Sequence, residues 1–113
     1  PEYLLEHPAE FARELLMAYI SQNSLTAILF SGSQANHFAD SIERSIKQMI
    51  FEKYPEFEED TAMNVMLSFC IQGSYHAYQK NRSGDIMTVI DVIAGMTGAV
   101  RPMYEERLGE SRS

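Results

Sequence analysis

The sequence predicts an all-α domain of about five helices. Apolar residues recur three or four positions apart along almost the whole chain, which is the helical period and not the alternating period of a strand. Glycine, proline and aspartate residues separate the apolar segments, as they do where helices begin and end. No linker or repeat divides the 113 residues, a length that suits one hydrophobic core. We therefore expect residues 1–113 to form a single domain.

The first predicted helix runs from Pro8 to about Gln22. Proline suits the first helical position, where its missing N–H is not needed, and Glu10 suits the first turn. One face of this helix is apolar and carries Phe11, Leu15, Ala18 and Tyr19. A short second element, SLTAILFSG (24–32), ends at a glycine that can cap a helix. Its β-like residues leave a strand open as the alternative.

The third helix is predicted from Gln34 to Tyr54, ahead of Pro55, with apolar residues at four-residue steps. On its polar face, Glu43 and Lys47 stand four residues apart and should form an ion pair. The link that follows, YPEFEED, is acidic, and acidic residues favour the positive end of the next helix. That fourth helix is predicted over residues 60–81 and is apolar on more than one face.

After the turn KNRSGD, in which Ser83 or Asp85 can act as the cap, the fifth helix is predicted to run to Leu108, with the residues beyond it fraying. It carries two apolar stripes: Ile86, Val89, Ile90 and Ile93; and Val92, Met96, Ala99 and Met103. A surface helix of a small domain needs only one stripe, so two stripes predict two packing partners. Pro102 crowds the carbonyl group of Gly98, which predicts a bend between these two residues.

The stretch IAGMTGAVRPMY (93–104) has two interpretations. A phosphate-binding loop needs its glycines between a strand and a helix N-terminus, whereas these glycines lie within a helix. Small residues four positions apart, as in Ala94 with Gly98 and Gly95 with Ala99, instead let a facing helix approach closely. The sequence favours this second interpretation, a seam between helices.

Composition excludes several classes of function. The net charge is −7, with 16 acidic residues against nine Lys and Arg, so the chain lacks the basic face that nucleic-acid binding requires. Polar residues interrupt every apolar run well before the roughly 18 residues of a membrane span, and we expect no membrane contact. The N-terminal residues do not have the pattern of a signal peptide. Because the chain begins at Pro1, we expect it to be part of a longer protein. One cysteine, Cys70, favours a reducing compartment, and we expect the cytoplasm.

No catalytic or metal-binding set is apparent, so we expect neither an enzyme nor a cofactor. The three histidines are far apart in sequence and belong to no HExxH motif or cysteine pair. Ser31 and Ser33 lack the G-x-S-x-G context of a nucleophile, and Cys70 on an apolar helix face is typical of a core residue. The acidic link lacks the alternating oxygen ligands of a calcium loop.

Three segments together resemble the C-terminal domain of TetR-family transcriptional regulators: PAEFARELLMAYISQNSLTAILFSG, HFADSIERSIKQMIFEKY and AMNVMLSFCIQGSYHAYQKNRSGDIMTVIDVIAGM. In that family, the helix before such a polar turn commonly contains a glycine and late aromatic residues, here Gly73, Tyr75 and Tyr78. The resemblance covers nearly the whole chain and rests on the order and spacing of helices.

This resemblance implies an effector domain that binds a small molecule and forms a homodimer through its last two long helices. It also implies an N-terminal helix-turn-helix domain that contacts DNA, and this chain contains nothing that reads as a basic recognition helix. We therefore expect this chain to be the effector-binding and dimerisation domain of a transcriptional regulator that acts as a repressor. The expected effector is a small apolar or amphipathic molecule. The alternative is a helical protein–protein interaction module without a ligand cavity.

The candidate site residues come from the aromatic and methionine content. Seven methionines, six phenylalanines and six tyrosines suit a cavity for apolar ligands, although the same residues also fill ordinary cores. The predicted ligand-binding residues are Tyr19, Phe38, Met49, Met66, Cys70, Tyr75 and His76. The predicted dimer interface comprises Val92, Gly95, Met96, Gly98, Ala99 and Met103.

Overall fold

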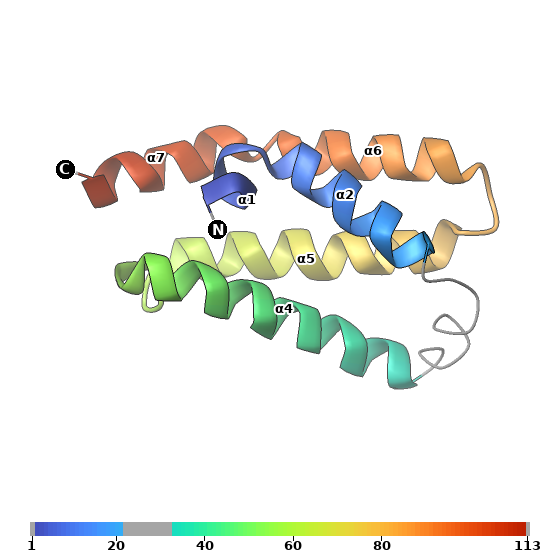
Figure 1. Cartoon of the computed structure of the whole chain (residues 1–113), viewed down its shortest axis with the longest axis horizontal. Coiled ribbons are helices and arrows are strands. Elements are labelled where there is room, and N and C mark those ends of the chain that lie inside the picture. Colours follow the sequence, from blue (N-terminus) through green and yellow to red (C-terminus); the bar gives the residue numbers. More distant parts are fainter. Residues whose placement is uncertain (1, 22–32, 113) are drawn as a thin grey trace.

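The computed structural model describes residues 2–21 and 33–112, and every regular element in these two ranges is a helix (Figure 1). The longer helices are α2 (Pro8–Ser21), α4 (Ser33–Lys53), α5 (Thr61–Asn81), α6 (Ile86–Gly98) and α7 (Arg101–Arg112). Two shorter ones are α1 (Glu2–Glu6) and the 3-10 helix η1 (Pro55–Phe57). The predicted all-α class is confirmed. The element predicted over 24–32 lies outside the described residues.

Aspartate side chains fix where α5 and α6 begin. Asp60 Oδ1 accepts hydrogen bonds from the backbone N–H groups of Ala62 (3.1 Å) and Met63 (3.4 Å). Asp85 Oδ1 accepts one from the N–H of Met87 at 3.2 Å, so Asp85 caps α6. Each carboxylate satisfies N–H groups that have no partner within the helix and lies at the positive end of the helix dipole.

The predicted fifth helix is in fact two helices. α6 ends at Gly98 and α7 begins at Arg101, which places the break within the bend predicted between Gly98 and Pro102. Pro102 occupies the second position of α7, where its missing N–H is not needed. The helix also continues to Arg112, beyond the predicted end at Leu108.

α5 is the central helix of the bundle. It packs against α4 on one side and α6 on the other, and each of these neighbours runs antiparallel to it (Figure 1). α2 lies over α6, and α1 lies against α2 and α7. An ion pair between Arg13 Nη1 and Asp91 Oδ1 (2.6 Å) joins α2 to α6. α2 is therefore held mainly by α6 and passes over the middle of the bundle.

A polar network joins α4 to α5 at the surface. Glu43 Oε2 pairs with Lys47 Nζ at 2.9 Å, which confirms the predicted ion pair. Ser68 Oγ donates to Glu43 Oε2 (2.9 Å), and Gln72 Nε2 donates to Glu43 Oε1 (3.0 Å). Burial by itself would raise the pKa of Glu43, but the hydrogen bonds from these three side chains outweigh burial and hold the pKa below its ordinary value.

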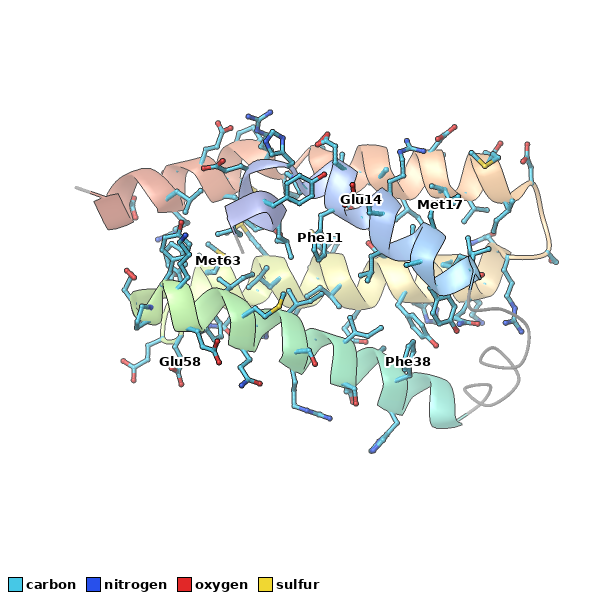
Figure 2. The ribbon with its side chains drawn as sticks, viewed as in Figure 1. Phe11, Glu14, Met17, Phe38, Glu58 and Met63 are labelled. Atoms are coloured by element: carbon cyan, nitrogen blue, oxygen red, sulfur yellow. The ribbon has the colours of Figure 1, made fainter. Side chains whose placement is uncertain are left out.

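The buried side chains form two separate clusters at opposite ends of the bundle. The larger one joins α1, the end of α4, η1, the start of α5 and α7, and includes Leu5, Ile50, Met63 and Tyr104. The smaller one joins the ends of α2 and α5 to α6 and consists of Leu16, Tyr78, Ile90 and Ile93. Figure 2 shows Phe11 of α2 and Met63 of α5 turned toward the interior. The core is therefore divided into two clusters.

Candidate functional site

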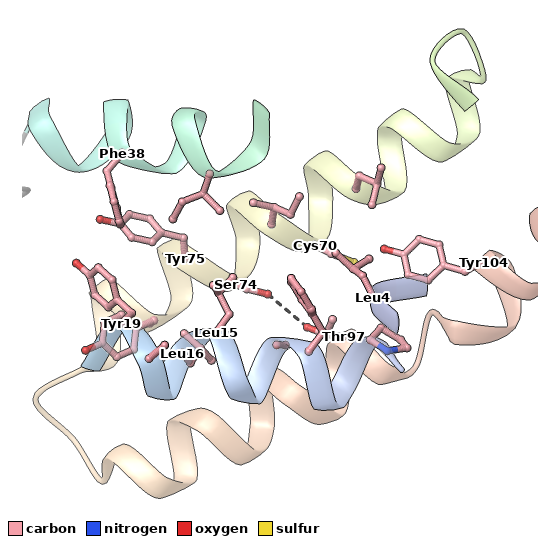
Figure 3. A pocket seen from close by; sticks show the side chains of 18 residues that line it. Leu4, Leu15, Leu16, Tyr19, Phe38, Cys70, Ser74, Tyr75, Thr97 and Tyr104 are labelled. Atoms are coloured by element: carbon pink, nitrogen blue, oxygen red, sulfur yellow. Dashed lines mark hydrogen bonds between the residues drawn. The ribbon is translucent and has the colours of Figure 1, made fainter. Parts of the chain in front are cut away.

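A partly open cavity of about 280 Å³ lies between the two core clusters (Figure 3). Most of its lining comes from α2 and α5, and α4 supplies Phe38 and Ile42. It touches the larger cluster at Leu4 and Tyr104 and the smaller one at Tyr78. The cavity thus occupies the part of the core that the described side chains leave unfilled.

The cavity wall is apolar and carries no formal charge on any of its described residues. Its polar groups are the hydroxyls of Tyr19, Ser74, Tyr75, Tyr78, Thr97 and Tyr104 and the thiol of Cys70. Because an ion buried without a partner is costly, this wall accepts neutral molecules more readily than charged ones. Apolar pockets with a few placed polar groups are the usual form of small-molecule sites.

Aromatic rings gather at one end of the cavity (Figure 3). The ring centroids of Tyr19 and Phe38 are 5.5 Å apart, those of Phe38 and Tyr75 5.7 Å, and those of Tyr19 and Tyr75 6.0 Å. Tyr78 stands edge-on to Tyr19 at 5.5 Å. These separations are within the range in which aromatic pairs attract each other. The rings come from α2, α4 and α5, so this end of the cavity depends on the relative positions of three helices.

The two hydroxyls at this aromatic end differ in their hydrogen bonds. Gln79 Nε2 donates to the Tyr19 hydroxyl at 3.1 Å. The Tyr75 hydroxyl oxygen is fully buried and has no hydrogen-bond partner among the described residues. Burial, followed by the nearby Tyr19 hydroxyl, raises the pKa of Tyr75 to about 12. Tyr75 therefore keeps its proton at neutral pH and carries a buried donor whose hydrogen-bonding capacity is unused.

Four of the other polar groups of the cavity interact in two pairs. Ser74 of α5 and Thr97 of α6 share a hydrogen bond of 3.3 Å. Cys70 and Tyr104 interact at the opposite end, where burial raises the pKa of the Cys70 thiol and also that of the Tyr104 phenol. A thiol with a raised pKa is a poor nucleophile, which agrees with the interpretation of Cys70 as a packing residue.

Four of the predicted ligand-binding residues line the cavity: Tyr19, Phe38, Cys70 and Tyr75. The remaining three are not among its lining residues. Met66 is buried within the larger core cluster, whereas Met49 and His76 are exposed. Met49 precedes the buried Ile50, and His76 follows Tyr75, which lines the cavity. One step along a helix turns a side chain by about 100°, which is enough to turn Met49 and His76 to the surface.

The structure also brings in lining residues that the sequence analysis did not single out. Leu4 belongs to α1, which has only five residues and gives almost no periodic signal. Thr97 lies near the end of α6 and Tyr104 near the start of α7, so both sides of the break between these helices contribute to the lining. The apolar stripe of the first predicted helix, with Phe11 and Leu15, was the signal that could have placed α2 over a cavity.

A second feature is an uncovered apolar surface on the side of α5, α6 and α7 that faces away from α2. We call it the outer face and define it as Val65, Phe69, Gly73, Val92, Met96, Ala99 and Met103. Phe69 is 76% exposed and Met96 68% exposed. Helical spacing places the α5 members opposite the buried Tyr78. It turns Val92 by about 100° and Met96 by about 140° from Asp91, which pairs with Arg13 of α2. Exposed large apolar side chains gathered on one side of a small domain are candidates for an interaction surface.

The predicted dimer residues divide between two surfaces. Val92, Met96, Ala99 and Met103 belong to the outer face, and Gly95 is exposed with no atom near the position of a Cβ. Gly98 instead faces α2 of its own chain, because a Cβ there would lie 2.9 Å from the Ala9 Cβ. The close helix–helix approach predicted from the small residues is therefore found at Gly98 within the chain, and Gly98 is not available to a partner.

By length and composition alone, residues Ile86–Glu110 are apolar enough to cross a membrane. Only 17% of the most apolar window is buried, which reflects the uncovered outer face. One such segment is weak evidence for a span, and here it is interrupted at Ala99–Val100 and bears the ion-paired Asp91.

Comparison with known proteins gives no relatives: no family model, no curated protein and no solved structure matches this chain. Within residues 2–21 and 33–112, no three His, Cys, Asp or Glu side chains are grouped so that they could hold a metal ion. The cavity and the outer face are therefore the two features of the described residues that bear on function.

Proposed function

We propose that this chain is the effector-binding and dimerisation domain of a TetR-like transcriptional regulator that acts in the cytoplasm. One observation carries the proposal: the same helices line an apolar cavity on one side and carry the outer face on the other. Ser74 of α5 and Thr97 of α6 lie at the cavity, while Phe69 and Met96 of these helices lie on the outer face. A ligand that shifts α5 relative to α6 would therefore also change the outer face.

The partner for the outer face in this proposal is a second copy of the chain. The seven residues that define the face carry no charge, although the net charge of the chain is −7. Glu58 and Glu59 lie at its edge, in a shallow pocket that Val65 and Phe69 also line, so contact between two copies is least opposed at the α6 part of the face. Gly73 and Gly95 have no atom within 4 Å of a Cβ position, which leaves room for a facing helix. A two-fold axis would pair α5 and α6 of each copy in a four-helix bundle.

The mechanism would be a population shift between two arrangements of the helices. The aromatic end of the cavity uses α2, α4 and α5, so a bound ligand that contacts all three favours the arrangement in which they are closest. A DNA-binding domain in this proposal would be attached before α1, whose Leu4 lines the cavity. A shift of the helices would then change the distance between the two DNA-binding domains of the dimer. Ligand affinity and operator affinity would then be linked reciprocally.

The reading frame upstream of Pro1 tests the regulator class. A TetR-like regulator requires roughly 50 further residues with two short helices joined by a tight turn and a basic second helix. A purified protein that includes them should bind a palindromic DNA site as a dimer. If those residues encode something other than a helix-turn-helix, the regulator assignment is wrong.

The second candidate function is a helical interaction module, which the outer face alone favours. In that case a different protein binds the outer face, and the isolated chain stays monomeric. The cavity would then be only a packing defect. Self-association distinguishes the two functions, because a homodimer that buries Met96 supports the regulator domain and a stable monomer supports the module.

A further inference from the structure

Two phenol hydroxyls, those of Tyr19 and Tyr75, lie at the aromatic end of the cavity (Figure 3). Among the described residues, the Tyr75 hydroxyl has no hydrogen-bond partner, and its oxygen is so fully covered that a ligand acceptor reaches it only when the Tyr75 ring turns toward the cavity. The Tyr19 oxygen already accepts a hydrogen bond from Gln79, which leaves the proton of Tyr19 for a further acceptor. A buried donor that stays unsatisfied is costly, so an acceptor placed here by a ligand would gain more than the same group gains in water.

Building on the proposed effector-binding function, we infer that the cavity takes an uncharged, mainly apolar molecule with one carbonyl-type acceptor, which binds between Tyr19 and Tyr75. A carbonyl oxygen has two lone pairs and can accept from both phenols. The rings of Phe38 and Tyr78 beside them favour a flat, unsaturated group next to that carbonyl.

Size and charge narrow the ligand class. At the packing density of protein interiors, a cavity of about 280 Å³ holds roughly 200 Å³ of ligand, which corresponds to about a dozen non-hydrogen atoms. A carboxylate would fit by size, but no cationic side chain is among the described lining residues, so its desolvation would go uncompensated. The neutral ketone or ester is therefore preferred over the acid of the same shape.

Three naphthalenes of nearly identical shape test the inference: 2-acetylnaphthalene, 2-ethylnaphthalene and 2-naphthoate. Their affinities are measured by equilibrium dialysis against the 113-residue chain, the Tyr75→Phe variant and the Tyr54→Phe variant. Tyr54→Phe is the matched control, because it removes the phenolic hydroxyl of a buried tyrosine in the larger core cluster that is not among the residues lining the cavity. Circular dichroism establishes that each variant is folded. If Tyr75→Phe does not fold, Tyr75→Leu is used in its place.

In the unaltered chain, the ketone should bind about tenfold more tightly than the hydrocarbon, the usual weight of one buried hydrogen bond, and the acid should bind most weakly. Tyr75→Phe should reduce this preference to about twofold or less without weakening hydrocarbon binding, while Tyr54→Phe retains it. Equal binding of ketone and hydrocarbon in the unaltered chain would refute the acceptor inference and leave an effector cavity standing. Failure of all three compounds to bind would refute the ligand-binding function itself.

Discussion

Replacing Gly98 with alanine tests the contact between α2 and α6, which positions α2 and its lining residues at the cavity. The new Cβ would lie 2.9 Å from the Ala9 Cβ, and carbon atoms pack without strain at about 3.5–4.0 Å, so the helices must separate by roughly 0.6–1.1 Å. Overpacking of this kind costs about 1–3 kcal/mol. Better helix propensity returns at most about 1 kcal/mol. We therefore expect Gly98→Ala to lower the free energy of unfolding by about 1 kcal/mol.

Gly95→Ala is the matched control, one turn away on the same helix. No atom of the same chain lies within 4 Å of its Cβ position, so in the monomer only the propensity gain remains. At protein concentrations below those of dimer formation, the variant should therefore be more stable by about 0.5–1 kcal/mol. Urea unfolding followed by circular dichroism measures both variants. In the double variant Ala9→Gly with Gly98→Ala, the clash is relieved and the two changes should be favourably coupled. A Gly98→Ala protein as stable as Gly95→Ala, or a double variant without coupling, would contradict the packing described for α2.

Three further outcomes concern caps and titrating groups. Asp60→Ala should cost about 1 kcal/mol because α5 loses its cap, whereas Glu59→Ala should change stability by less than about 0.5 kcal/mol in the same urea titration. Burial raises the pKa of Glu43, but hydrogen bonding to Lys47 contributes to a net lowering of this pKa from 4.5. The contribution of the ionised Glu43 to the free energy of unfolding is therefore complete above about pH 4.5, and it is lost as the pH falls through the lowered pKa of the folded protein. Glu43→Gln should flatten the loss of unfolding free energy below that pH, and an unchanged acid slope would contradict the shift. The pKa of Tyr75 is raised from 10.0 to about 12, so the contribution of its neutral phenol to the free energy of unfolding is present below pH 10 and is lost as the pH rises toward 12. Tyr75→Phe should therefore reduce the loss of thermal stability between about pH 10 and pH 12, measured by thermal unfolding scans.

Local signals in the sequence were sufficient for most of the fold. Asp60 and Asp85 act on N–H groups within three residues, so both helix starts could be read directly from the chain. α1 was missed because five residues are too few to show a period. The break before Arg101 was anticipated only as a bend, because Pro102 marks a weakness in the helix but not how far the chain turns there.

The site depended on contacts that no local pattern specifies. A pair of helical glycines indicates close packing, but the sequence did not reveal that Gly98 faces Ala9 of the same chain. Aromatic content indicated Tyr19 and Tyr75 as candidates, whereas their approach to within 6.0 Å and the unsatisfied Tyr75 hydroxyl arise from packing α2 across α5. Met49 and His76 were assigned from residue type alone, and the phase of their helices turns them to the surface.

The most direct test of the proposed domain is sedimentation equilibrium on the unaltered chain, Met96→Glu and Met87→Glu. Both methionines are exposed on α6, but they are nine residues apart and therefore lie on opposite faces, with only Met96 on the outer face. We expect a dimer at micromolar concentration that persists in Met87→Glu and dissociates at least about tenfold more readily in Met96→Glu, because a carboxylate would be buried unpaired. A monomeric unaltered chain, or equal dissociation of the two variants, would contradict it.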